Sequence, residues 1–128
     1  MTRRRSAGRL SIAVFGVLLC FGAEGQALAH AKLVSAKPAE SKTATPPPTE
    51  LQLKFSEAIE LNFAQVKVTG ADGKPVKTGP PALDPSDKAT LIVPLAAPLT
   101  DGKYMVSWQV VAADGHKTKG SYSFEAKK

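Results

Sequence analysis

The feature that most constrains the fold is an alternation of apolar and polar residues with a period of two. Leu51, Leu53 and Phe55 alternate with polar residues, and the longer run 104–110 alternates in the same way. Because successive side chains of a β-strand point to opposite faces, this pattern is typical of strands that bury one face. No helical spacing is sustained anywhere after residue 30, so the pattern predicts an all-β chain.

Turn signals separate the alternating runs. They are short clusters of Pro, Gly, Asp and Ser, such as those at 45–48, 71–75, 79–81, 85–87, 100–102 and 114–115. The runs between them predict strands near 32–37, 50–56, 63–70, 74–78, 89–95, 103–112 and 117–126. This spacing predicts a seven-stranded antiparallel Greek-key β-sandwich, as in immunoglobulin-like folds. We expect the strand that carries Trp108 to be central and its indole to anchor the core.

The first residues have the three parts of a secretory signal. Arginines at 3–5 and 9 give a positive start, residues 10–21 form an apolar run, and Ala27-Leu28-Ala29 supplies the small residues of a cleavage site. The apolar run is short for a membrane-spanning helix, which disfavours an uncleaved anchor. We therefore expect a signal peptide at 1–29, cleaved before His30, and one domain at 30–128. A cut after Ala27 is the weaker alternative, and both the general and the twin-arginine export routes stay open.

Removal of the signal changes what composition implies. The formal charge falls from +6 to +3 because Arg3, Arg4, Arg5, Arg9 and Glu24 are lost. The basic balance is thus weak evidence for nucleic-acid binding, and we expect none. Cys20, the only cysteine, also lies in the signal, so the processed chain has no disulfide, zinc-thiolate or blue-copper site. The remaining domain is too small for a Rossmann or TIM-barrel enzyme. We expect it to be periplasmic and not inserted in the membrane.

The processed chain has two histidines, and cleavage would make His30 the first residue. An N-terminal histidine offers a free amine and an imidazole, and when Nδ1 and the amine bind one metal they close a chelate ring. Such a nitrogen pair suits Cu(II), which prefers tetragonal N,O coordination. The amine has a reference pKa of about 7.7–8.0, so the affinity should fall below neutral pH. The alternative is that His30 belongs to a disordered tail.

The second candidate element is Asp114-Gly115-His116. In an extended segment the first and third side chains project to the same side, so the carboxylate and the imidazole can meet one ion. Asp-Gly between two alternating runs is also a hairpin signal, and His116 can equally be a solvated turn residue. Together with His30 and its amine, the two residues supply three nitrogens and one oxygen. This set fits a tetragonal Cu(II) plane and is poor for structural zinc, calcium or magnesium sites.

Three segments of the chain look like the CopC family of periplasmic copper-resistance proteins. They are the segment that begins His30-Ala-Lys-Leu-Val, the run Leu53-Lys-Phe-Ser-Glu57, and the pattern Trp108, Asp114-Gly-His116, Gly120 and Phe124. The resemblance implies a Greek-key β-barrel or sandwich of cupredoxin-like topology. It also implies a Cu(II) site formed by His30, Asp114 and His116, with Glu57 nearby as an outer or weak axial group, or simply as a solvated carboxylate. A membrane partner resembling CopD, a copper importer, is implied as well.

The chain departs from one feature of that family. Some relatives have a methionine-rich loop that binds Cu(I) through thioethers, whereas Met105 is the only methionine after the signal. It lies in the middle of a predicted strand, where we expect it to serve packing. We therefore predict no methionine-rich Cu(I) site.

These observations favour a periplasmic protein, not an enzyme, that binds one Cu(II) ion and sequesters or carries it. A copper monooxygenase with a terminal-histidine brace is an alternative, but Asp114 would fill the coordination plane that oxygen needs, and aromatic residues are few. A metal-free secreted sandwich domain is the other alternative. Such a domain would gain nothing from a histidine at its processed terminus.

Overall fold

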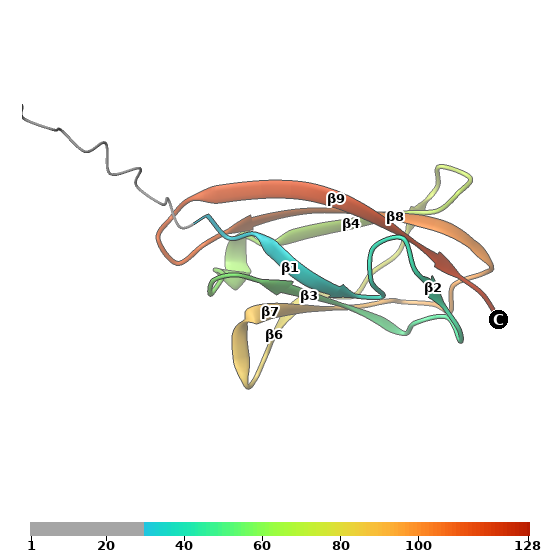
Figure 1. Cartoon of the computed structure of the whole chain (residues 1–128), viewed down its shortest axis with the longest axis horizontal. Helices are drawn as coiled ribbons and strands as arrows, with labels where there is room; N and C mark the ends of the chain where they lie inside the picture. The colour runs from blue at the N-terminus through green and yellow to red at the C-terminus, as the bar shows by residue number, and fades with distance from the viewer. Residues whose placement is uncertain (1–29) are drawn as a thin grey trace, which may run out of the picture.

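Two β-sheets stack face to face in the computed structural model, which describes residues 30–128 (Figure 1). The first sheet has the order β1-β3-β7-β6, formed by β1 (Leu33–Lys37), β3 (Glu50–Phe55), β7 (Asp87–Pro94) and β6 (Ala82–Asp84). The second has the order β2-β9-β8-β4-β5, formed by β2 (Thr43–Ala44), β9 (Lys117–Ala126), β8 (Gly102–Val111), β4 (Gln65–Thr69) and β5 (Pro75–Val76). The all-β sandwich is confirmed. The predicted signal peptide lies outside the described residues.

All seven predicted strands are present, but the number seven is wrong, because β2 and β6 were missed. Both are too short to show an alternation, and β6 lies between two proline-containing turn signals. The expectation of purely antiparallel pairing is also wrong, because β2 pairs with the end of β9 in parallel. A single turn of 3-10 helix, η1 (Leu61–Phe63), precedes β4 and delays its start to Gln65. Among the described residues, no helix is long and apolar enough to span a membrane.

The core lies between the sheets and is built by the alternation seen in the sequence. In β3, the side chains of Leu51, Leu53 and Phe55 are buried, and β8 contributes its own alternate residues from the opposite sheet. Strand β8 is the middle strand of its sheet, as predicted. Met105 has the opposite phase and points outward, with 52% of its surface exposed, so the packing role expected for it is wrong.

Trp108 anchors this core as predicted. Its ring meets that of Phe55 edge to face, with 5.1 Å between centroids. The indole also lies against Gly120, its pairing partner in β9. A Cβ atom on Gly120 would lie 2.6 Å from an indole ring carbon, so only glycine leaves room for the tryptophan here. The pair fixes the packing of β8 on β9.

The strand order brings distant parts of the chain to one end of the sandwich. Figure 1 shows the start of β1, the end of β3 and the β8–β9 hairpin at the end opposite to the C-terminus. Backbone hydrogen bonds join the segment after β3 to the hairpin, since Glu60 N donates to Val111 O and Ala113 N donates to Ala58 O. All the histidines of the chain lie at this end.

Candidate metal centre

The hairpin between β8 and β9 carries the Asp-Gly-His element. Ala112 N donates to His116 O at 2.9 Å, and Gly115 N donates to Ala112 O at 2.8 Å, which closes a three-residue loop. Gly115 has a φ of +88°, a left-handed conformation that glycine adopts without strain. The hairpin that the sequence signalled is therefore present, and it projects from the end of the central strand.

Asp114 holds His116 through two contacts. One carboxylate oxygen accepts the backbone N–H of His116 at 3.0 Å, and the other lies 3.0 Å from His116 Nδ1. When Nδ1 donates this bond, the lone pair of the neutral ring is on Nε2, which is then free to act as a ligand. The backbone N–H of His116, followed by its side chain, lowers the pKa of the Asp114 carboxyl from the usual value. The carboxylate thus stays ionised and keeps the ring oriented.

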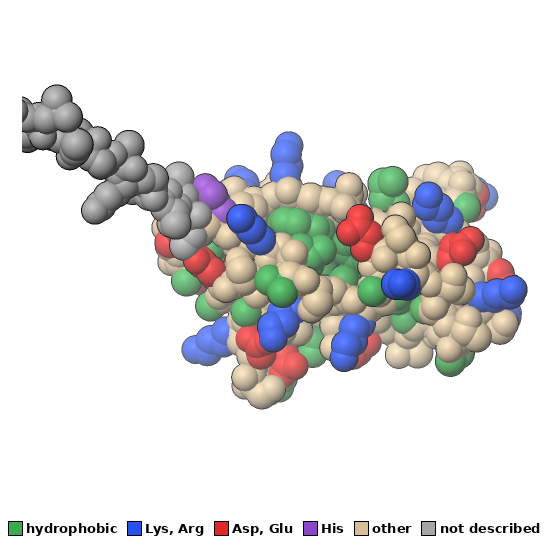
Figure 2. Space-filling view, viewed as in Figure 1, with side chains coloured by type: hydrophobic (Ala, Val, Ile, Leu, Met, Phe, Trp, Pro, Cys, Tyr) green, Lys and Arg blue, Asp and Glu red, His purple; other side chains and the backbone are tan. Residues whose placement is uncertain are grey.

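His30 reaches the same place from the opposite end of the sequence. Its ring meets the ring of His116 edge to face, with 5.1 Å between centroids and 89° between planes. In the face that Figure 2 draws, histidine, shown in purple, is seen only at the end where the described chain begins. His30 Nδ1 is buried and has no hydrogen-bond partner among the described residues. A buried nitrogen without a partner costs roughly 1–3 kcal/mol, which a bound metal ion would offset.

The side chains as they stand are not a finished metal site. Within residues 30–128, no three His, Cys, Asp or Glu side chains are grouped closely enough to hold an ion. What the structure brings together is two imidazoles and one carboxylate, a donor set that fits copper better than calcium or magnesium. Glu57 lies in the segment between β3 and η1, and it takes part in neither of the ion pairs formed among the described residues.

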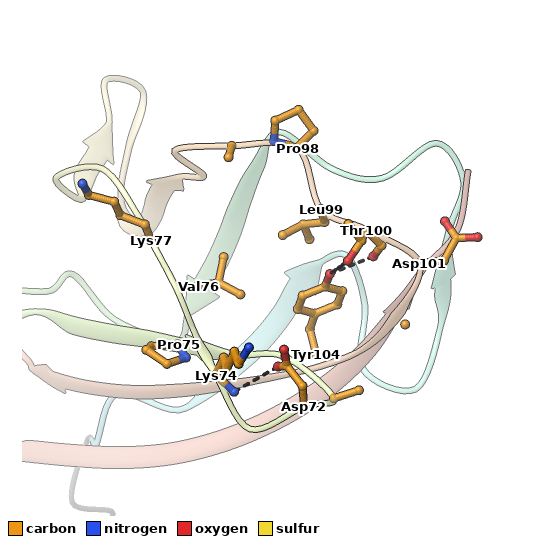
Figure 3. A pocket seen from close by; sticks show the side chains of 14 residues that line it. Asp72, Lys74, Pro75, Val76, Lys77, Pro98, Leu99, Thr100, Asp101 and Tyr104 are labelled. Carbon is orange, nitrogen blue, oxygen red and sulfur yellow. Dashed lines mark hydrogen bonds between the residues drawn. The ribbon is translucent and has the colours of Figure 1, made fainter.

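A separate cavity lies at the other end of the sandwich. It has a volume of about 360 Å³, and its lining includes Val76, Leu99 and Tyr104 (Figure 3). The Tyr104 hydroxyl points toward the loop before β8 and donates to Thr100 O at 2.7 Å, so its proton is already used within the protein. None of the predicted site residues lines this cavity. At the histidine end, by contrast, the side chains of His116 and Asp114 are 48% and 36% exposed, so an ion in solution can reach them.

Two residues near the histidines were missed by the sequence analysis. Ser56 and Thr118 donate hydrogen bonds to the backbone of residues 30 and 31. Serine and threonine in or beside an alternating run carry no signal of their own. Only the positions of the strands reveal their partners.

The titration of Asp114 is a direct test of the hairpin geometry. We expect the carboxyl-carbon NMR signal of Asp114 to titrate with a pKa below the usual aspartate pKa of about 3.9. Since the backbone N–H is the largest cause, His116→Ala should keep the part of the lowering that this N–H provides and lose the part due to the imidazole. Because the pKa of Asp114 is lowered in the folded state, its ionised carboxylate stabilises the fold at pH values above the unfolded-state pKa. This stabilisation is lost as the pH falls through the folded-state pKa. A titration at or above the usual value would contradict this geometry.

Comparison with known proteins gives several matches. A family model described as the CopC domain matches residues 33–127. Protein YobA of Escherichia coli (strain K12) is 44% identical over 99 residues, which cover 77% of this chain and 80% of that protein. Copper resistance protein C of Xanthomonas campestris pv. juglandis is 36% identical over 110 residues, covering 82% of this chain and 86% of that protein.

A solved structure and a longer relative extend the comparison. The crystal structure of PcoC, a methionine-rich copper resistance protein from Escherichia coli, is 31% identical and has a TM-score of 0.69. That match covers 77% of this chain and 100% of that one. Copper transport protein CutJ of Bacillus subtilis (strain 168) is 29% identical over 96 residues, which cover 75% of this chain but 18% of that protein. A domain similar to this chain therefore also occurs within a longer copper transport protein.

Proposed function

The chain belongs to the CopC domain family, and on this premise we propose that it is a periplasmic protein that binds one Cu(II) ion and sequesters or carries it. Several relatives are named for copper resistance or copper transport, and none of these names describes an enzyme. The chain is accordingly a copper-binding protein and not an enzyme.

The proposed ligands are His30, Asp114 and His116. The observation that carries this assignment is the edge-to-face contact of the two imidazoles, with the Nδ1 atom of His30 buried and without a partner. After cleavage before His30, its amine and Nδ1 would chelate the ion, and His116 Nε2 and an Asp114 oxygen would complete the plane. The amine is created only by processing, and rotation of the two rings would bring the side-chain donors together. Glu57 remains a candidate for an outer position.

The donor set determines both the metal preference and the route of release. Nitrogen-rich tetragonal sites favour Cu(II) over the other divalent ions of the first transition row. Acid should release the ion because the amine, with a reference pKa of about 7.7–8.0, then becomes protonated. Asp114 would stay ionised over this range, since its pKa is lowered. Met105 is alone and exposed on the outer face of β8, so we propose that the chain has no methionine-rich Cu(I) site.

Export and transfer complete the proposal. Residues 1–29 would direct the chain out of the cytoplasm and then be removed. A membrane copper transporter resembling CopD would be the partner that receives or supplies the ion. The occurrence of a similar domain within a longer copper transport protein supports this pairing.

Titration of the processed protein with Cu(II) tests the proposal. We expect one equivalent to bind, with an electron paramagnetic resonance spectrum of a tetragonal site and hyperfine coupling from nitrogen, because three of the four ligands are nitrogens. The absence of any Cu(II)-dependent spectroscopic change would contradict the proposal.

A pair of matched substitutions tests the role of the carboxylate in the same titration. Asp114 and Asp72 each accept the backbone N–H of the residue two positions on, both at 3.0 Å, and asparagine can accept the same bond. Asp114→Asn should therefore keep the hairpin but weaken Cu(II) binding by at least about 10-fold, because loss of a direct ligand should cost no less than loss of an outer-shell group, which costs about 10–100-fold. Asp72→Asn, at the far end of the sandwich, should leave the affinity unchanged.

A further inference from the structure

The backbone just after the proposed terminal ligand is held at three consecutive carbonyl groups. His30 O accepts a hydrogen bond from Ser56 Oγ at 3.3 Å, and Ala31 O accepts one from Thr118 Oγ1 at 2.9 Å. Lys32 O accepts one from Ser56 N at 2.8 Å. Lys32 N in turn donates to Ser56 Oγ at 2.9 Å, so this hydroxyl is donor and acceptor at once.

The donors come from both sheets. Ser56 directly follows β3, at the end of the first sheet, and Thr118 lies near the start of β9, in the second sheet. The segment 30–32 is therefore tied across the open end of the sandwich, before β1 begins to pair. Ala31 adds a buried contact, since its side chain is only 1% exposed and belongs to the core.

Chain ends are normally frayed unless something ties them down. Here two hydroxyl groups and one buried methyl fix the residue that would carry both the amine and the Nδ1 ligand. We propose that Ser56 and Thr118 are positioning residues that preorganise His30 for the copper ion. This inference rests on the proposed function, and it assigns to the two hydroxyls a role in affinity rather than in folding alone.

The size of the effect follows from the entropy of ordering. When a residue is disordered in the free protein and becomes ordered only when the ion binds, the association constant for the ion falls on the order of 5- to 30-fold per residue. Preorganisation removes this cost before the ion arrives. Without either hydroxyl, copper would itself have to order residues 30–32.

The test uses the processed protein and copper alone. Thr118→Val, which keeps the shape but loses the hydroxyl, and Ser56→Ala should each weaken Cu(II) affinity about 5- to 30-fold in competition with a chelator. Thr118→Ser should restore most of the wild-type affinity. In the copper-free protein, the amide of Lys32 should exchange with solvent faster in both weakened variants, as NMR would show. Ser56 is exposed, so its variant tests the inference without disturbing the core.

Thr100→Val is the matched control. Its hydroxyl also makes a half-buried hydrogen bond, to Tyr104, but at the far end of β8. The substitution Thr100→Val should lower thermal stability without changing copper affinity. Three outcomes would overturn the inference and leave the proposed function intact. Thr100→Val could weaken copper affinity as much as the other variants do, or Thr118→Ser could fail to restore it. The third is wild-type affinity in both Ser56→Ala and Thr118→Val. A wild-type protein that binds no copper would instead overturn the proposed function, and this inference with it.

Discussion

His30→Ala in the processed protein is expected to abolish tight Cu(II) binding. Two of the four proposed ligand atoms belong to His30, and the substitution removes the imidazole and breaks the chelate ring. Losing one of two linked binding groups commonly lowers affinity by about 10²–10⁴-fold. Competition with a chelator of known affinity measures the loss. The fold should be unaffected, because His30 is not among the residues of the hydrophobic core, the first of which is Ala31.

A second form of the protein separates the amine from the ring. A chain with one methionine left before His30 keeps the imidazole but turns the amine of His30 into an amide, which must lose its proton before it can bind Cu(II). We expect this chain to bind Cu(II) more weakly than the processed chain, and enzymatic removal of the methionine should restore binding. Equal affinity of the extended and the processed chains would show that the amine is not a ligand.

Gly120→Ala is expected to have the largest effect on stability. The added Cβ would lie 2.6 and 2.9 Å from two ring carbons of Trp108, and that ring also packs edge to face against Phe55. Overpacking of a core costs about 1–3 kcal/mol. For a domain of this size, each kcal/mol lowers the melting temperature by about 4–8 °C. Thermal unfolding of the copper-free protein measures the effect.

The cause can be isolated with a double-mutant cycle. Trp108→Phe removes the indole atoms nearest to residue 120, so Gly120→Ala should cost much less in that background than in the wild type. If Gly120→Ala costs the same in both backgrounds, the tryptophan is not the reason for the glycine. Copper affinity should stay unchanged in all variants that remain folded.

The fold could be predicted from the sequence where strands are long and half buried. In β8 the alternation runs over ten residues, and it correctly gave the buried face and the central position of Trp108. Strand β2 has two residues and β6 has three, which is too short for an alternation with a period of two to be recognised. Their pairing depends on which strands lie beside them, and that is a property of the whole sandwich.

The candidate site was predictable in its chemistry but not in its assembly. Residue types and the cleavage signal singled out His30, Asp114 and His116 as donors. Periodicity could not show that the start of β1 lies beside the β8–β9 hairpin, because that contact depends on the strand order. Periodicity also could not show the contact between Asp114 and His116 or the hydrogen bonds donated by the Ser56 and Thr118 hydroxyls. These contacts depend on the three-dimensional positions of the side chains.

The intact mass of the exported protein, measured under native conditions with and without Cu(II), tests the central claim most directly. It reports the processed terminus and the metal stoichiometry together. The account predicts a chain that consists of residues 30–128 and gains the mass of one copper ion. A secreted chain that starts at any other residue, or one that starts at His30 and retains no copper, would contradict it.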